Sequence, residues 1–210
     1  GGVLDLSFFG GEPLLEARLI SSMIDFAQET AARSSVSVSL SLTTNGTQTR
    51  PDAWEIMTRP DLELAISHDG LPEAHDRHRV GLDGAGSSRQ VEETILRLLD
   101  VEKEFSVITV VRPDTVHLLS DGVSYLRDLG VRRVEPSLDL WTRWTEADAA
   151  RLEQAIAQAA RLWASSLSEF AVSWFDTRLA RLARVPETAS PACGFGDGEI
   201  AVAPSGRLYP

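Results

Sequence analysis

Strand-like and helix-like patterns alternate along this chain, and a helix-like segment follows each strand-like one. Strands are predicted at 3–9, 36–43, 62–67, 105–111 and 131–136. The pattern is strictest at 36–43, where apolar residues take every second position. A chain that repeats strand and helix five times is predicted to form a parallel sheet with helical crossovers, either open or curled toward a barrel.

Helix signals fill the intervals between these strands. Helices are predicted at about 13–32, at 52–58, after Ser87, at 115–129, at 145–168 and at 172–184. The buried face expected for the first helix consists of Leu15, Leu19, Met23 and Phe26. The expected helix-end signals are Ser87 with Gln90, Thr145 with Asp148, and Gly130.

The chain changes character near residue 186. Residues 186–193 (PETASPAC) are loop-like, and residues 199–210 (EIAVAPSGRLYP) resemble two short strands joined by a turn. We therefore predict one domain at 1–185, with a helical linker at about 146–185, and the start of a second domain at 186–210.

Composition limits the classes of function. The chain has 210 residues, and 31 acidic residues against 20 basic ones give a net charge of -11, which argues against binding to a nucleic acid backbone. No apolar run approaches the ~20 residues of a membrane span, so no membrane partner is expected. The single cysteine, Cys193, cannot form a disulfide within the chain, which favours a reducing, cytoplasmic setting.

Polar, turn-forming residues gather where the predicted strands end. The segments after the five strands contain GGEP, TTNG, SHDGLPEAHDRHR, RPDT and EPSLD in chain order. In parallel α/β proteins, ligands bind at the carboxyl ends of the strands. We therefore expect the functional site at this edge of the sheet.

Gly10, Gly11 and Glu12 follow the first strand. Two adjacent glycines alone are as consistent with a tight turn as with a ligand site. Glycines let a ligand approach the backbone, and a nearby carboxylate attracts an ammonium group. A turn for phosphate would use N–H groups and usually a basic residue, so this turn is suited to a cation.

Four of these motifs together resemble those of radical S-adenosylmethionine (SAM) enzymes. Residues 7–15 (SFFGGEPLL) are similar to the family's GGEP segment, which binds the ammonium group of SAM in that family. TTNG at 43–46 resembles the family's TNG. Residues 67–79 resemble the S-x-D-G…H-D-x-x-R signature of its peptide- and protein-modifying branch, and GAGSS at 84–88 fits the usual G-x-G-S opening of the next helix.

The end of the chain resembles the SPASM extension of this family. Residues 193–210 (CGFGDGEIAVAPSGRLYP) are similar to the segment Cys-x(9–15)-Gly-x4-Cys, in which Gly206 would be the glycine. The resemblance implies that Cys193 is one ligand of an auxiliary iron–sulfur cluster. Without that resemblance, a lone cysteine would be interpreted as a small buried apolar residue.

The resemblance also implies a fold and a cofactor. The expected fold is a partial (β/α)6 TIM-like barrel that lacks the first strand, followed by the start of a small SPASM/twitch β-hairpin region. The family's CxxxCxxC motif, which binds the catalytic [4Fe-4S] cluster, comes after that first strand and does not occur in this sequence. We therefore expect an internal fragment that is inactive alone, whose parent cleaves SAM to a 5′-deoxyadenosyl radical. The implied partners are a peptide or protein substrate and an electron donor such as flavodoxin or ferredoxin.

SAM-binding roles are implied by the resemblance for Gly10, Gly11, Glu12, Pro13, Asn45, Ser67, Asp69 and Arg79. Ser67 would donate to the SAM carboxylate or ribose, and Arg79 would pair with the carboxylate through its planar guanidinium, with Arg89 as a weaker candidate. Asp69 and Asn45 are equally consistent with shaping their own turns.

Two further groups of residues are open to a functional and a structural interpretation. The spacing of His68, His75 and His78 matches no common zinc pattern, so we expect His75 to order its loop. Trp141 and Trp144 flank the end of the fifth strand, and they either line a peptide-binding cleft or pack in the interior.

The sequence thus favours a radical SAM/SPASM enzyme that modifies a peptide or protein side chain, as in the maturation of ribosomal peptides. Three alternatives remain open: an anaerobic sulfatase maturase that forms formylglycine, a maturase for a quinone-type cofactor peptide, and a non-catalytic SAM- or peptide-binding relative. A barrel hydrolase that uses Glu12 and Asp69 is disfavoured, because Glu12 lies in a glycine turn suited to a cation.

Overall fold

The computed structural model describes residues 2–167, 169–183 and 199–209. The chain divides into two compact units, Gly1–Trp174 and Phe175–Pro210. The boundary predicted near 186 and the side chain of Cys193 lie outside the described residues, so both remain predictions.

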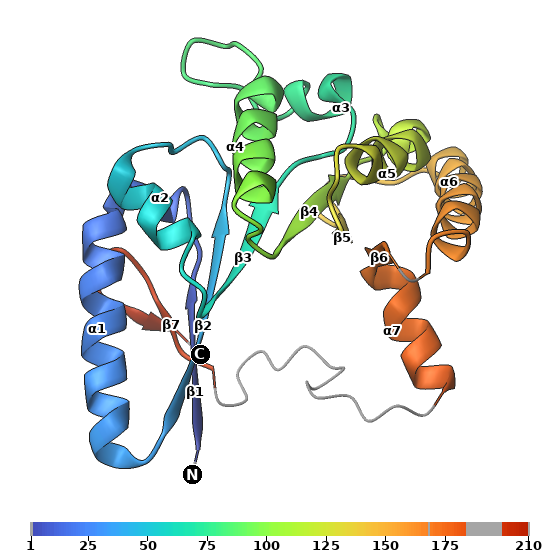
Figure 1. The fold of residues 1–210 in the computed structure, drawn as a ribbon. Coiled ribbons are helices and arrows are strands. Elements are labelled where there is room, and N and C mark those ends of the chain that lie inside the picture. Colours follow the sequence, from blue (N-terminus) through green and yellow to red (C-terminus); the bar gives the residue numbers. More distant parts are fainter. Residues whose placement is uncertain (1, 168, 184–198, 210) are drawn as a thin grey trace. The chain divides into compact units, whose positions relative to one another are not determined.

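A six-stranded parallel sheet forms the centre of the first unit. Its strands are β1 (Val3–Phe8), β2 (Ser37–Thr44), β3 (Leu62–Ser67), β4 (Phe105–Val111), β5 (Arg133–Leu138) and β6 (Ala171–Val172). They lie side by side in chain order, and the helices between them follow the outer side of the curved sheet (Figure 1). The predicted parallel α/β architecture is confirmed. The short edge strand β6 was not predicted, because a strand of two residues is too short to show an alternation of apolar and polar residues.

The helical segments agree with the predicted order, except that the short helix α3 was not predicted. They are η1 (Pro13–Glu16), α1 (Ala17–Ser34), α2 (Pro51–Met57), α3 (Pro72–Asp76), α4 (Ser88–Asp100), η2 (Val116–Leu118), α5 (Leu119–Asp128), α6 (Glu146–Ala164) and α7 (Ser173–Leu182). The predicted capping box of Thr145 and Asp148 is confirmed at the start of α6. Gly130 has φ +105, as expected for a residue that ends a helix. No helix in the described part of the chain is long and apolar enough to cross a membrane.

The predicted capping box of Ser87 and Gln90 is wrong. The Ser87 hydroxyl makes no cap hydrogen bond, because it donates to the Arg79 carbonyl and contacts the ring of His75. Asp76 replaces it from a distant position in the sequence. The two Asp76 oxygens accept hydrogen bonds from the backbone N–H and the hydroxyl of Ser88, at 2.8 and 2.7 Å.

The buried face predicted for α1 is also wrong. Leu15, Leu19, Met23 and Phe26 are between 42% and 69% exposed, whereas Leu14, Ala17, Ile20, Ile24 and Ala31 are buried. Both faces of this helix carry apolar residues at helical spacing, so periodicity alone could not choose between them. The exposed side chains of Met23 and Phe26 line a shallow groove of about 260 Å³ together with Leu4 and Leu6 of β1.

The two faces of the sheet differ in chemistry. The face under the helices is apolar and carries Leu40, Leu42, Leu64, Ile66, Val107, Val111 and Val134, all buried. The opposite face carries Asp5, Ser7, Ser39, Ser41, Thr43, Glu63, Ser67, Ser106, Arg133, Glu135 and Ser137, together with the apolar residues Ala65, Ile108 and Val110, all at least partly exposed. Both faces of a parallel sheet are normally covered and apolar. The second set, which we call the polar face, is therefore available to a ligand.

A small hairpin forms the described end of the second unit. The strands β7 (Ala201–Val202) and β8 (Leu208–Tyr209) pair antiparallel, and the Gly206 N–H closes their turn on the Ala203 carbonyl at 2.8 Å. The two short strands predicted for this segment are confirmed. Their assignment to a SPASM domain remains a prediction.

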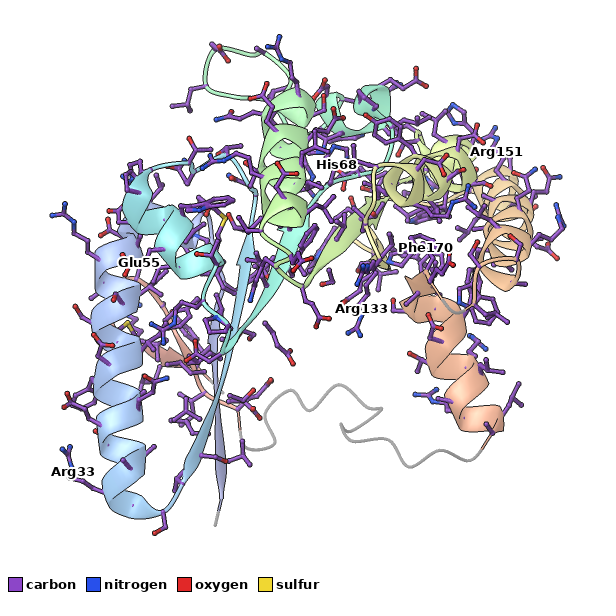
Figure 2. All side chains as sticks on the ribbon, in the orientation of Figure 1. Arg33, Glu55, His68, Arg133, Arg151 and Phe170 are labelled. Atoms are coloured by element: carbon purple, nitrogen blue, oxygen red, sulfur yellow. The ribbon has the colours of Figure 1, made fainter. Side chains whose placement is uncertain are left out.

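His68 is a buried polar residue between the sheet and the helices. Figure 2 labels it at the carboxyl end of β3, beside α4. Its side chain is fully buried, and neither ring nitrogen has a hydrogen-bond partner among the described residues. The nearest charge is Glu92, whose Oε1 lies 3.7 Å from Nε2. Burial, reinforced by neighbouring His75, lowers the pKa of His68 to about 3, so the ring is neutral at physiological pH.

We expect acid to destabilise the fold through His68. The unfolded chain binds a proton at this residue below the ordinary histidine pKa of 6.5 and the folded chain does not, so stability falls as pH drops from 6.5 toward 3. His68→Leu should remove roughly 2 kcal/mol of the stability difference between pH 7 and pH 5, as measured by urea denaturation. The matched control is His117→Leu, at an exposed position. An unchanged difference in His68→Leu would refute this role.

Gly70 should tolerate no side chain. Its φ is +88, and an added Cβ would lie 2.7 Å from the Gly122 Cα, inside α5. Gly70→Ala should cost roughly 2–5 kcal/mol of unfolding free energy, from the left-handed backbone and the clash together. Gly84 is the matched control, because it has φ +79 with nothing within 4 Å of its Cβ position. Equal losses in the two alanine variants would show that the contact between Gly70 and Gly122 is unimportant.

Candidate functional site

Three successive strand ends carry the predicted site residues. β1 leads into Gly10–Pro13, β2 ends beside Asn45, and β3 ends at Ser67, two residues before Asp69. Because these strands are parallel neighbours, the three segments lie at one edge of the sheet. The structure thus places Gly10–Pro13, Asn45 and Ser67 at one edge of the sheet, and their joint role in binding SAM remains a prediction.

The glycine turn after β1 is open. Gly10 has φ +142, a conformation that side chains rarely adopt, and no atom lies within 4 Å of a Cβ added at Gly10 or Gly11. Packing therefore does not require the second glycine. Pro13 occupies the first position of η1, where its missing N–H has no cost. The turn therefore leaves open space where side chains would stand, so a ligand can approach its backbone.

Glu12 connects the ends of two strands. Its Oε1 accepts hydrogen bonds from the Leu14 N–H at 3.0 Å and from the Thr44 hydroxyl at 2.8 Å. Its Oε2 accepts one from the Asn45 N–H at 2.7 Å. A carboxylate can accept about four hydrogen bonds, so Oε2 keeps a free lone pair. Glu12 both fixes the turn and presents a negative charge at this edge.

Asn45 shapes its own turn, as one of its two interpretations predicted. Its Oδ1 accepts hydrogen bonds from the N–H and the hydroxyl of Thr47, at 2.9 and 2.8 Å. The next residue, Gly46, has φ +72, and its carbonyl accepts a hydrogen bond from the Thr94 hydroxyl of α4 at 2.8 Å. The TTNG turn is therefore fixed in position, and a ligand contact by the Asn45 amide nitrogen remains a prediction.

Asp69 and Arg79 bind each other. Arg79 Nε and Nη2 lie 2.7 and 3.0 Å from the two Asp69 oxygens, and the Val110 N–H donates to Asp69 Oδ1 at 2.9 Å. Only 5% of the Asp69 side chain is exposed. This pair joins the end of β3 to β4 and to the following loop. Contacts of these two residues with SAM remain predictions, for which Arg79 keeps its Nη1.

His75 orders this loop. Its Nδ1 accepts the Asp69 N–H at 3.3 Å, so its Nε2 carries the proton and donates to the Ser87 hydroxyl at 2.9 Å. Ser87 in turn donates to the Arg79 carbonyl at 2.9 Å. Burial lowers the pKa of His75 to about 4 and keeps this tautomer neutral. No group of three or more His, Cys, Asp or Glu side chains in the described residues could hold a metal ion.

Ser67 and Glu135 both lie on the polar face. Ser67 pairs with Ile108, and Ile108 pairs with Glu135, so the register places Ser67 and Glu135 at the same level two strands apart. Both are half-buried, and no hydrogen bond or ion pair of either side chain occurs within the described residues. Glu135 was not predicted as a site residue. The alternation at 131–136 could have placed Glu135 on the sheet face opposite to that of Val134. Its alignment with Ser67, two strands away, depends on strand register, which the sequence does not reveal.

Comparisons with known proteins agree with this geometry. No protein-family model matches the chain. An uncharacterized protein of Methanocaldococcus jannaschii is 29% identical over 137 residues, which are 65% of this chain and 46% of that protein. The cysteine-type anaerobic sulfatase-maturating enzyme of Clostridium novyi is 24% identical over 215 residues, which cover 97% of this chain and 57% of that enzyme. The chain spans about half the length of these curated relatives.

Solved structures share the fold. The anaerobic sulfatase-maturating enzyme anSMEcpe with bound AdoMet (SAM) superposes with a TM-score of 0.83 at 18% identity, over all of this chain and 60% of that one. SuiB of Streptococcus suis bound to its precursor peptide SuiA gives a TM-score of 0.56 at 14% identity, over 90% of this chain and 42% of that one. In sequence and fold, the chain is similar to radical SAM maturases, and the resemblance predicted from its motifs is confirmed.

Proposed function

We propose that this chain is part of a radical SAM enzyme that modifies a peptide or protein side chain. The observation that carries the proposal is the open glycine turn with the Glu12 carboxylate, at the edge of an uncovered polar sheet face. A similar structure with a TM-score of 0.83 contains SAM. Another, with a TM-score of 0.78, contains SAM and the Kp18Cys peptide.

The described residues fit the methionine end of SAM. The carbonyls of the glycine turn and Glu12 Oε2 would bind its ammonium group. The hydroxyl of Ser67 and Nη1 of Arg79, which have no hydrogen-bond partner among the described residues, would donate to its carboxylate or ribose. When bound beside an iron–sulfur cluster, SAM supplies a 5′-deoxyadenosyl radical that abstracts hydrogen from the substrate. The chain's own contribution is to orient the cofactor and exclude water.

Parts outside the described residues complete the proposed enzyme. The free edge of β1 and the apolar groove formed with Met23 and Phe26 would accept a preceding strand and helix of the parent protein. The cysteines of the catalytic [4Fe-4S] cluster would come after that strand, and Cys193 would bind an auxiliary cluster. A reduced flavodoxin or ferredoxin would supply the electron in the cytoplasm.

A sulfatase maturase is the second candidate. The similarity to the Clostridium novyi enzyme extends over 97% of this chain, which favours formylglycine formation among the possible reactions. A non-catalytic relative would differ from both enzymes in the parent sequence, because its upstream CxxxCxxC cysteines would be replaced.

The central test uses the full-length parent protein. After anaerobic reconstitution with iron and sulfide, reduction in the presence of SAM should release 5′-deoxyadenosine, measured by liquid chromatography and mass spectrometry. The control replaces the upstream cluster cysteines with alanine. A preparation that contains the cluster but releases no 5′-deoxyadenosine would exclude the enzyme and leave only a binding protein.

Glu12→Gln should weaken SAM binding by the parent protein. Glutamine keeps one acceptor oxygen, but its NH2 group cannot accept the hydrogen bond made to the other oxygen, and it lacks the charge that attracts ammonium. Because a hydrogen bond to a charged group contributes about 1.5–3 kcal/mol, the Kd for SAM should rise roughly 10- to 100-fold in calorimetry. Glu16→Gln is the matched control, at an exposed position in the same segment. An unchanged Kd would remove Glu12 from the cofactor site.

A further inference from the structure

The turn after β5 is held in one conformation by a single carboxylate. Asp139 accepts hydrogen bonds from the Trp141 N–H at 3.0 Å, the Thr142 N–H at 3.3 Å and the Thr142 hydroxyl at 2.8 Å. These bonds, of which the Thr142 hydroxyl contributes most, lower the pKa of Asp139. The carboxylate therefore stays ionised and keeps the turn ordered at neutral pH.

The same turn is attached to the neighbouring strand. Arg112, directly after β4, donates to Asp139 Oδ2 at 2.6 Å, and the Asp139 N–H donates to the Val111 carbonyl at 3.0 Å. The indole N–H of Trp144 donates to the Asp139 carbonyl at 2.8 Å. Trp144 is half-buried, so the packing interpretation fits this tryptophan.

Trp141 is displayed to solvent by this ordered turn. Its relative exposure is 101%, which contradicts the alternative that it packs in the interior. An indole buries about 150–250 Å² when it binds, and a rigid aromatic side chain loses little conformational entropy. Exposed tryptophans in ordered positions are the type of residue that dominates binding energy at interfaces.

The position of Trp141 indicates what it contacts. The turn follows β5 at the same edge of the sheet as the glycine turn and Ser67, and Trp141 lies four positions after Ser137 of the polar face. Peptides are present in three of the similar structures. We propose that Trp141 is a specificity residue that binds an apolar side chain of the substrate peptide next to the cofactor site. This inference rests on the proposed function.

The experiment uses the full-length parent protein with SAM bound. A display library of random 12-residue linear peptides is selected on the wild-type protein, and the Kd of enriched peptides is measured by fluorescence anisotropy. Trp141→Ser should raise that Kd about tenfold or more, and Trp141→Phe should retain most of the affinity. Val101→Ser is the matched control, because Val101 is 53% exposed and lies after α4, at the amino end of the sheet.

Two further measurements separate this inference from the proposed function. Loss of peptide affinity in Trp141→Ser with an unchanged Kd for SAM supports peptide binding by Trp141. A higher Kd for SAM in this variant would overturn the inference, because Trp141 would then contact the cofactor. Equal peptide affinity in wild type and Trp141→Ser, or a SAM-binding protein that enriches no peptide, would also overturn it. The proposed function fails separately, if the wild-type protein neither binds nor cleaves SAM.

Discussion

Carboxylates at successive strand ends hold together the edge on which the candidate site depends. Glu12 joins the end of β1 to that of β2, Asp69 joins the end of β3 to β4, and Asp139 joins the end of β5 to Arg112 after β4. Backbone N–H groups just beyond the strand ends no longer bond to a neighbouring strand, so they need other acceptors. At an edge that admits a ligand, closely packed backbone carbonyls are not available as these acceptors. Acidic side chains meet this need, since each carboxylate accepts several hydrogen bonds at once.

These hydrogen bonds change how the acidic residues of the sequence motifs are interpreted. Within the signature at 67–79, Asp69 and Arg79 were implied to contact SAM, and Asp69 was equally consistent with shaping its turn; in the structure these two residues bind each other. His75 accepts the Asp69 N–H and orders the loop, as expected. Glu12 can both fix the strand ends and bind a ligand, because Oε2 accepts only one of its three hydrogen bonds and keeps a free lone pair. Conversely Glu135, which was part of the EPSLD segment but not named as a site residue, is a carboxylate on the polar face without a partner among the described residues.

Most of the fold could be predicted from the sequence, because five strands have clear alternation and the caps of several helices are local. The errors share one cause, which is that tertiary contacts decided between locally equivalent choices. Asp76 displaced Ser87 as the cap of α4, although the two residues are far from adjacent in sequence. The candidate edge was predictable because polar, turn-forming residues occur directly after each strand. The position of Glu135 at the same level as Ser67 could not be predicted, because it depends on strand register. The pairing of Asp69 with Arg79 could not be predicted either, because it depends on the path of the loop between them.

The chemistry of the sheet bears on the question whether it is open or curled. An open parallel sheet normally has helices on both faces, and both faces are then apolar. Here the burial of Leu42, Ile66 and Val107 places the helices on one face, whereas the polar face carries mostly serine, threonine and charged residues, with a few apolar residues among them. A curled sheet with the helices outside and this largely polar face inside fits that chemistry. The Trp141 turn follows β5 and therefore lies at the carboxyl edge of this face.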